Sequence, residues 1–238
     1  MKRTYLFQLI CTVLILVASV SCGLQREDVG PYQDDKRTFG MTNFDRLDMG
    51  SAFIIRVQAG SEFQIIAEGD RRNLDDLDVY TRNGTLYARY HNSRSRKYET
   101  SFTIVMPTLR GVSFSGASQS TINGFDNLNE LDIQLSGASK GQFALQAREV
   151  DLTLSGASNL ELNGEGVEME ADLAGASTLK AFSYPVKTAD LNVSGASNAS
   201  VSVSGTLDVE ASGASKVRYR GTPSVRQRLS GASSVHTD

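Results

Sequence analysis

The tripeptide Gly-Ala-Ser occurs seven times between residues 116 and 233, and six of the seven copies follow a serine. Successive copies begin 18 to 21 residues apart, at Gly116, Gly137, Gly156, Gly175, Gly195, Gly213 and Gly231. A repeat this short cannot bury a hydrophobic face by itself, so each copy has to pack against its neighbours in a stack.

The residues six, four and two positions before the repeated glycines are apolar in the second to the sixth copy. These triplets are Leu131/Ile133/Leu135, Val150/Leu152/Leu154, Met169/Ala171/Leu173, Ala189/Leu191/Val193 and Leu207/Val209/Ala211. Strict alternation predicts a strand with one buried face. A second alternation follows the tripeptide, as in Leu160/Leu162 and Val217/Tyr219. Each repeat therefore predicts two short strands hinged at a Ser-Gly-Ala-Ser corner.

The corner residues indicate how the stack is built. Glycine suits a sharp bend, and alanine is expected on the crowded inside of the corner because its side chain is small. The serines should form columns whose hydroxyls bond to each other or to the turn backbone. A coil of this length with two or three strands predicts an all-β parallel β-helix, with coils about 4.8 Å apart. The alternative, a leucine-rich horseshoe, would require a Leu-x-x-Leu-x-Leu signature that this sequence lacks.

Residues 38–107 read as an irregular β region that precedes the coils, which occupy 108–238. Asn83-Gly84 is a strong hairpin signal. The stretch Leu47-Asp48-Met49-Gly50-Ser51 echoes the later corners, so this region is expected to form the first part of the same rod. It is also expected to cap the first coil, because an uncovered end leaves unpaired strand edges.

The first 21 residues read as a signal peptide, with Lys2 and Arg3 before an apolar run from Leu6 to Val20. Ser19-Val20-Ser21-Cys22 resembles a bacterial lipobox, with serine in place of the usual leucine three positions before the cysteine. This predicts an outer membrane lipoprotein anchored through Cys22, followed by a flexible tether to residue 37. The alternative is a secreted protein whose Cys22 is incidental. Both the cell surface and the periplasmic face remain open.

Cysteine content and charge exclude several classes of function. Only Cys11 and Cys22 are present, and Cys11 lies in the expected signal peptide, so the mature chain has no internal disulfide and no cysteine metal site. The formal net charge of −3 argues against nucleic acid as a partner.

An acidic column stands five residues before successive glycines. It consists of Asp132, Asp151, Glu170, Asp190 and Asp208, and ends at Arg226. Carboxylates stacked at coil spacing could share a cation or line a groove like that of a polysaccharide lyase. The alternative is a solvated face copied by repeat duplication, and the uniformity of the column favours it. We therefore expect no metal, no cofactor and no enzyme activity; the lyase and a periplasmic structural scaffold are the alternatives.

Tyrosines and arginines between residues 80 and 98 form the best candidate ligand surface. Tyrosine rings beside guanidinium groups can stack sugars or bind anionic polymers, although half-buried tyrosine is also common in strands. The candidate residues are Tyr87, Arg89, Tyr90, Arg94 and Arg96, together with Tyr184 in the Phe182-Ser183-Tyr184-Pro185 segment.

Groups for nucleophilic catalysis are scarce. The only histidines are His91 and His236, and a corner serine repeated seven times is a structural part with no strained elbow around it.

The Ser-Gly-Ala-Ser corners, the segment Met106–Val112 and the Phe44-Asp45-Arg46-Leu47 stretch resemble one family, the putative auto-transporter adhesins with a head GIN domain. This family is frequent among Bacteroidetes lipoproteins, and the resemblance covers about residues 38–238. It implies a right-handed single-stranded β-helix at the cell envelope with an adhesive role. The expected partners are the membrane, through the lipid anchor, and a glycan or a host or matrix protein.

Overall fold

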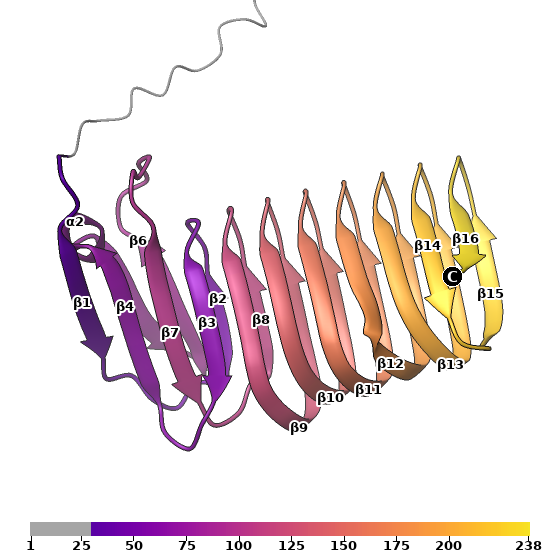
Figure 1. Cartoon of the computed structure of the whole chain (residues 1–238), viewed down its shortest axis with the longest axis horizontal. Coiled ribbons are helices and arrows are strands. Elements are labelled where there is room, and N and C mark those ends of the chain that lie inside the picture. The colour runs from indigo at the N-terminus through magenta and orange to yellow at the C-terminus, as the bar shows by residue number, and fades with distance from the viewer. Residues whose placement is uncertain (1–29) are drawn as a thin grey trace, which may run out of the picture. The chain divides into compact units, whose positions relative to one another are not determined.

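The computed structural model describes residues 30–238 (Figure 1). Residues 32–93 and 98–238 form one compact unit, and the Arg94–Lys97 segment groups with a separate unit. The expected signal peptide, the lipidation site Cys22 and most of the tether lie outside the described residues. Among those described, no helix combines the length and the apolar character needed to span a membrane.

Strands make up nearly all of the regular structure. They are β1 (Asp34–Phe39), β2 (Arg46–Met49), β3 (Ile54–Ala59), β4 (Gln64–Asp70), β5 (Leu77–Arg82), β6 (Thr85–Tyr90), β7 (Thr100–Met106), β8 (Gly111–Phe114), β9 (Gln119–Leu135), β10 (Lys140–Leu154), β11 (Asn159–Leu173), β12 (Thr178–Val193), β13 (Asn198–Ala211), β14 (Lys216–Arg220), β15 (Ser224–Leu229) and β16 (Ser234–Thr237). One short helix, α2, spans Arg71–Leu74.

Strands β9 to β13 are stacked in parallel and in register, so the predicted parallel β-solenoid is confirmed (Figure 1). The apolar triplets before the glycines all point inward and are buried, which confirms the alternation prediction. Burial of these rows is the main stabilising contribution, at about 25 cal/mol per Å² of apolar surface.

The repeated corners stack directly on one another. From the second corner onward the alanine N–H donates to the glycine carbonyl of the preceding coil, as from Ala157 to Gly137 at 2.7 Å. The corner glycines have φ between +72° and +80°. A side chain on Gly175 would place its Cβ 2.5 Å from the carbonyl oxygen of Gly156. Glycine is therefore required at the corner for two reasons, backbone conformation and space.

The expectation that alanine lies on the inside of the corner is wrong, whereas the predicted bonding of serine hydroxyls to the turn backbone is confirmed. The alanines point outward and are exposed, as at Ala157, whereas the serine that follows is buried, as at Ser158. The Ser158 hydroxyl donates to the carbonyl of Ser155 at 2.7 Å, and five more corners make the equivalent bond, four of them at 2.7 to 2.9 Å. Serine occupies the inside because its hydroxyl satisfies a turn carbonyl that alanine would leave without a donor.

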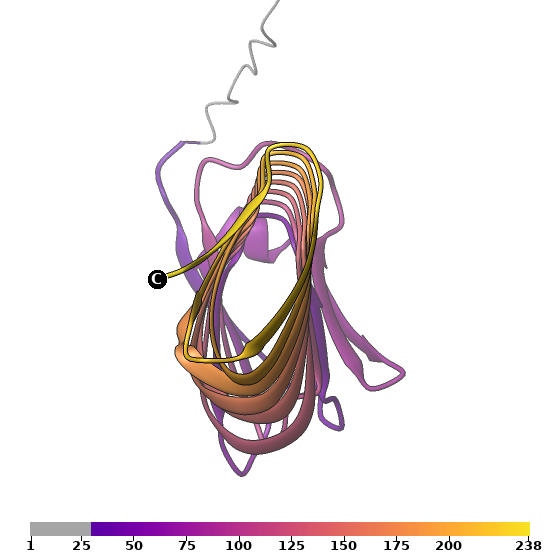
Figure 2. The same cartoon turned by 90° about the vertical axis from the view of Figure 1, so that its right-hand side faces the viewer.

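Each of the strands β9 to β13 is one long strand that bends at the edge opposite the corners, where two separate short strands were predicted (Figure 2). β10 pairs with β11 from Lys140 to Leu154 with a single unpaired position, so the ladder continues around the bend. Between β10 and β11 the ladder is therefore broken completely only at the corner, whereas β11 and β12 are also unpaired between Glu161 and Glu168.

The N-terminal region continues the rod, as the echo at Leu47–Ser51 predicted, but in a changed order. β2 lies between β6 and β8, and β3 lies between β7 and β9, all in parallel. The coil formed by β2 and β3 thus lies between two coils that follow it in the sequence. Antiparallel strands cover the end: β4 pairs with β7, β1 with β4, and β5 with β6.

The coil formed by β15 and β16 buries its apolar residues less completely than the others. Leu229 is 43% exposed, and Gln227 stands where earlier coils carry an apolar residue. Arg228 pairs with Glu210 of the neighbouring β13.

Candidate functional site

Two tyrosines and an arginine form a cluster on the outward face of the β5–β6 hairpin. Asn83 and Gly84 both have positive φ, so the two-residue turn places Tyr80 directly opposite Tyr87. Their ring centroids lie 5.0 Å apart with planes inclined by 16°. The Arg89 guanidinium carbon lies 5.4 Å from the Tyr87 centroid and 5.9 Å from that of Tyr80. We refer to these three residues as the aromatic platform.

Tyr90 belongs mainly to the core. Its ring packs edge-on against Phe53 with centroids 4.9 Å apart, and its hydroxyl donates to Thr100 Oγ1 at 2.7 Å. It follows Arg89 in the strand, so alternation places it on the face opposite the aromatic platform. It is a poor candidate for ligand contact for this reason.

The expectation that Tyr184 lies on a ligand surface is wrong, because its side chain is fully buried. The Tyr184 hydroxyl donates to the carbonyl of Ala147 at 3.0 Å and accepts from the N–H of the same residue at 3.2 Å. To reach that strand it passes Gly166, where any Cβ would lie 2.8 Å from the hydroxyl. Burial raises its pKa to about 12.

Arg94 and Arg96 fall in the Arg94–Lys97 segment, which groups with the other unit of the chain. Of the candidate surface proposed from the sequence, the solenoid unit brings together Tyr87 and Arg89, and it adds Tyr80 to them.

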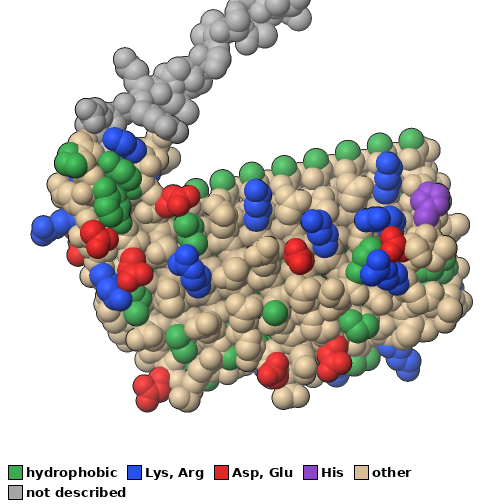
Figure 3. Space-filling view, viewed as in Figure 1, with side chains coloured by type: hydrophobic (Ala, Val, Ile, Leu, Met, Phe, Trp, Pro, Cys, Tyr) green, Lys and Arg blue, Asp and Glu red, His purple; other side chains and the backbone are tan. Residues whose placement is uncertain are grey.

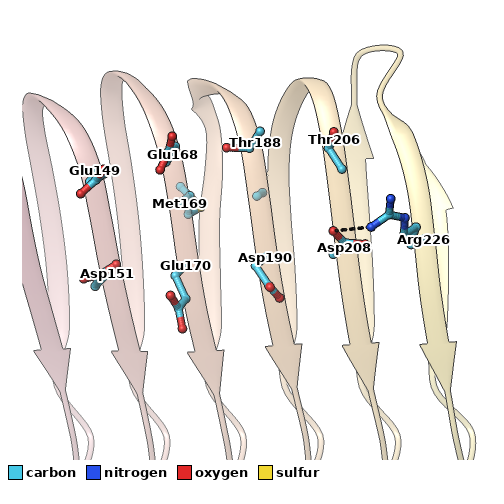
Figure 4. Close-up of a pocket in the computed structure, with 11 residues that line it drawn as sticks. Glu149, Asp151, Glu168, Met169, Glu170, Thr188, Asp190, Thr206, Asp208 and Arg226 are labelled. Carbon is cyan, nitrogen blue, oxygen red and sulfur yellow. Dashed lines mark ion pairs between the residues drawn. The ribbon is translucent and has the colours of Figure 1, made fainter.

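The acidic column exists as predicted and points outward from one face of the solenoid (Figure 4). An arginine closes it at each end. Arg226 on β15 lies 3.8 Å from Asp208. At the other end Arg46 on β2 donates to Asp132 across Gly111, whose missing side chain leaves room for the guanidinium group.

An open hollow of about 650 Å³ runs along the column from Asp151 to Arg226. Its lining residues are Glu149, Asp151, Glu168, Met169, Glu170, Thr188, Ala189, Asp190, Thr206, Asp208 and Arg226. Desolvation is the main cause that raises the pKa of Asp151, and repulsion from Asp132 and Glu170 raises it further. The pKa of Asp190 is likewise raised mainly by desolvation and further by repulsion from Asp208.

Chemically, the hollow offers carboxylates and little else. Ligand oxygens of Glu130, Asp132 and Asp151 lie within 4.8 Å of one another, a grouping that a hard cation could use, but Arg46 already binds Asp132. The lining includes no histidine, lysine or tyrosine that could act beside the acids as a base.

We expect Asp151→Asn to raise the thermal midpoint at neutral pH, because the substitution removes one member of a repelling row. A raised pKa means that the folded state binds the proton more tightly than the unfolded state. The gain should therefore be present at pH 7 and disappear as the pH falls through the raised pKa of Asp151. Thermal unfolding followed by circular dichroism at pH 7 and pH 4 measures it.

The matched control is Glu62→Gln, which removes the same charge from an exposed loop position away from the row. High salt should shrink the effect of the Asp151 substitution, because salt screens repulsion between exposed charges. An equal midpoint change in both variants would contradict the repulsion.

The opposite face carries a group of cations that the sequence reading did not identify. Lys216, Arg218 and Arg220 alternate with the inward Val217 and Tyr219 on β14. The alternation was a usable signal, since it places all three cations on the outward face.

The sequence model of one protein family matches most of the chain. The sequence model of the family described as "Putative auto-transporter adhesin, head GIN domain" matches residues 43–223. No curated protein gives a significant match.

Solved structures from Bacteroides and Parabacteroides species share the fold. A putative adhesin from Bacteroides fragilis has a TM-score of 0.78 at 19% identity, over 86% of this chain and 96% of that chain. A putative lipid binding protein from Parabacteroides distasonis has a TM-score of 0.71 at 14% identity, over 86% and 96%. A putative adhesin from Parabacteroides merdae has a TM-score of 0.68 at 14% identity, over 87% and 96%.

Proposed function

Because the chain belongs to the family described as putative auto-transporter adhesin, head GIN domain, we propose that it is a non-catalytic binding module of the cell envelope. Its solenoid presents ligands with a rigid lateral surface, and Cys22 anchors it to the outer membrane as a lipoprotein. The partner is a glycan or a host or matrix protein. The similarity to structures described as adhesins supports this proposal.

The aromatic platform is the observation that carries the proposal. Tyr80 and Tyr87 are only half buried, and the strands that hold them are fixed by Leu86 and Ala88, whose side chains are in the core. Because β5 pairs with β6 alone, Tyr80 lies at the edge of the sheet. Preformed rings with a neighbouring guanidinium bind a sugar or peptide at little entropic cost.

The proposal is tested by probing a glycan and matrix-protein array with the full chain purified in detergent, then repeating the assay with Tyr87→Ala and Arg89→Ala. We expect binding of at least one array member, and a loss of about tenfold in affinity for each variant, the size of effect that a buried aromatic contact gives.

Arg82→Ala is the matched control, because Arg82 lies on the outward side of the same hairpin and carries the same charge. It should bind like the unmodified chain. Unchanged binding by Tyr87→Ala and Arg89→Ala would show that the ligand attaches elsewhere, and an array with no bound member would oppose an adhesive role.

A further inference from the structure

Beyond the proposed function, we infer that the face around β14 is a second binding site, for an anionic polysaccharide. The site comprises Lys180 on β12, Lys216, Arg218 and Arg220 on β14, and His236 on β16. We refer to it as the basic face. Lysine and arginine side chains gather with the histidine toward the C-terminal end of the solenoid in Figure 3.

The cations of the basic face are held in defined positions by the ladder. Lys180, Ser200, Arg218 and His236 occupy one row across four neighbouring coils. Within residues 30–238, neither Lys180 nor Lys216 forms an ion pair with a carboxylate. Both ammonium groups are exposed and available to a ligand.

The two arginines are organised by an aromatic ring. The guanidinium carbon of Arg220 lies 4.0 Å from the ring centroid of Phe182, and that of Arg218 lies 5.6 Å from it. Stacking on the ring restricts the rotation of these long side chains, so a ligand that binds them loses less entropy. Phe182 thus gives a reason for arginine on β14, since lysine stacks less well.

These arginines already bind a carboxylate from the chain itself. The side chain of Asp238 accepts from Arg220 Nε at 2.8 Å and from Arg220 Nη2 at 2.6 Å, and its other oxygen lies 3.4 Å from Arg218 Nη1. This two-point contact shows that the guanidinium pair fits a carboxylate group. An acidic sugar would offer the same group to the remaining donors.

The surface beside the cations is hollowed and hydrophilic. A hollow of about 510 Å³ is lined by Thr178, Lys180, Asn198, Ala199, Ser200, Lys216, Arg218, Ser234 and His236. Its hydroxyl and amide groups are suited to sugar hydroxyls. Lys180 and Arg218 lie two coils apart, about 10 Å at the strand spacing of a sheet. A polymer with an acid on every second sugar could meet both, because a sugar and a coil advance by similar lengths.

The separation of opposite charges on the solenoid favours binding of a polyanion at the basic face. The acidic column occupies the strand halves before the corners, and the basic face occupies the halves after them, so the two lie on different faces. A polyanion is repelled from the first and attracted to the second. The net charge of −3 therefore does not describe the face that the ligand would meet.

The test measures binding of the full chain, in detergent, to immobilised polygalacturonate and dextran sulfate, with dextran as the neutral polymer. We expect binding to at least one charged polymer, none to dextran, and weakening with salt. The double variant Lys216→Gln/Arg218→Gln should lose about 30-fold in affinity, because it removes two charge-assisted contacts. Comparison of the two charged polymers separates a carboxylate from a sulfate ligand.

The matched control is Arg56→Gln/Lys140→Gln, which removes two positive charges from the same face nearer its N-terminal end. It should bind like the unmodified chain, and the circular dichroism spectra of both variants should match. Tyr87→Ala should also bind normally, which distinguishes this site from the aromatic platform. Equal loss in the two double variants, binding to dextran, or tighter binding to single-stranded DNA than to either polysaccharide would overturn the proposal.

Discussion

Replacing Tyr184 by alanine is expected to lower the free energy of unfolding by about 3–5 kcal/mol, the range for deleting a large buried aromatic side chain. The ring fills the interior where β11 and β12 are unpaired between Glu161 and Glu168. We expect β11 to collapse little into the space, because it stays paired with β10 along the same stretch. Urea or thermal unfolding of the variant gives the measurement.

Tyr184→Phe separates the hydroxyl from the ring. The substitution should lower the free energy of unfolding by about 1–3 kcal/mol, because the buried N–H and carbonyl of Ala147 both lose the Tyr184 hydroxyl as a hydrogen-bond partner. Tyr80→Phe is the control, since the Tyr80 ring lies on the surface and its hydroxyl has no role in the core. A stability of Tyr184→Phe equal to that of the Tyr80 variant would show that the bonds to Ala147 contribute nothing.

Gly175→Ala should lower stability by about 2–4 kcal/mol. The left-handed conformation costs a residue with a side chain about 1–2 kcal/mol, and here φ is +80°. The remainder comes from the 2.5 Å approach of the new Cβ to the Gly156 carbonyl oxygen, which cannot move without breaking its bond to Ala176. The thermal midpoint followed by circular dichroism checks the result.

Gly40→Ala is the matched control, because no atom lies within 4 Å of the position where its Cβ would be, and its φ is not positive. It should leave the midpoint nearly unchanged. If both variants unfold at the same temperature, the corner does not require glycine, and the repeated tripeptide would need a different explanation.

The aromatic platform was partly predictable. The Asn83-Gly84 turn fixes a two-residue hairpin, and the hairpin register then places Tyr80 opposite Tyr87 on the outward face. The burial of Tyr184 was not predictable, since it depends on a gap at Gly166, a residue of the neighbouring coil. A side chain in a solenoid meets residues about 20 positions away, and the composition of one coil does not reveal what its neighbour leaves open.

The sequence alone determined the period of the coil, the buried alternation, the glycine corners and the outward acidic column, because all of these follow from the local geometry of a strand repeated at a constant interval. Only the tertiary structure decided that β2 and β3 lie between later strands, that serine fills the corner while alanine points outward, and that Phe182 supports the arginines of β14. These features depend on which strand edge and which cavity are available after the stack has formed, and contacts of that kind leave no period in the sequence.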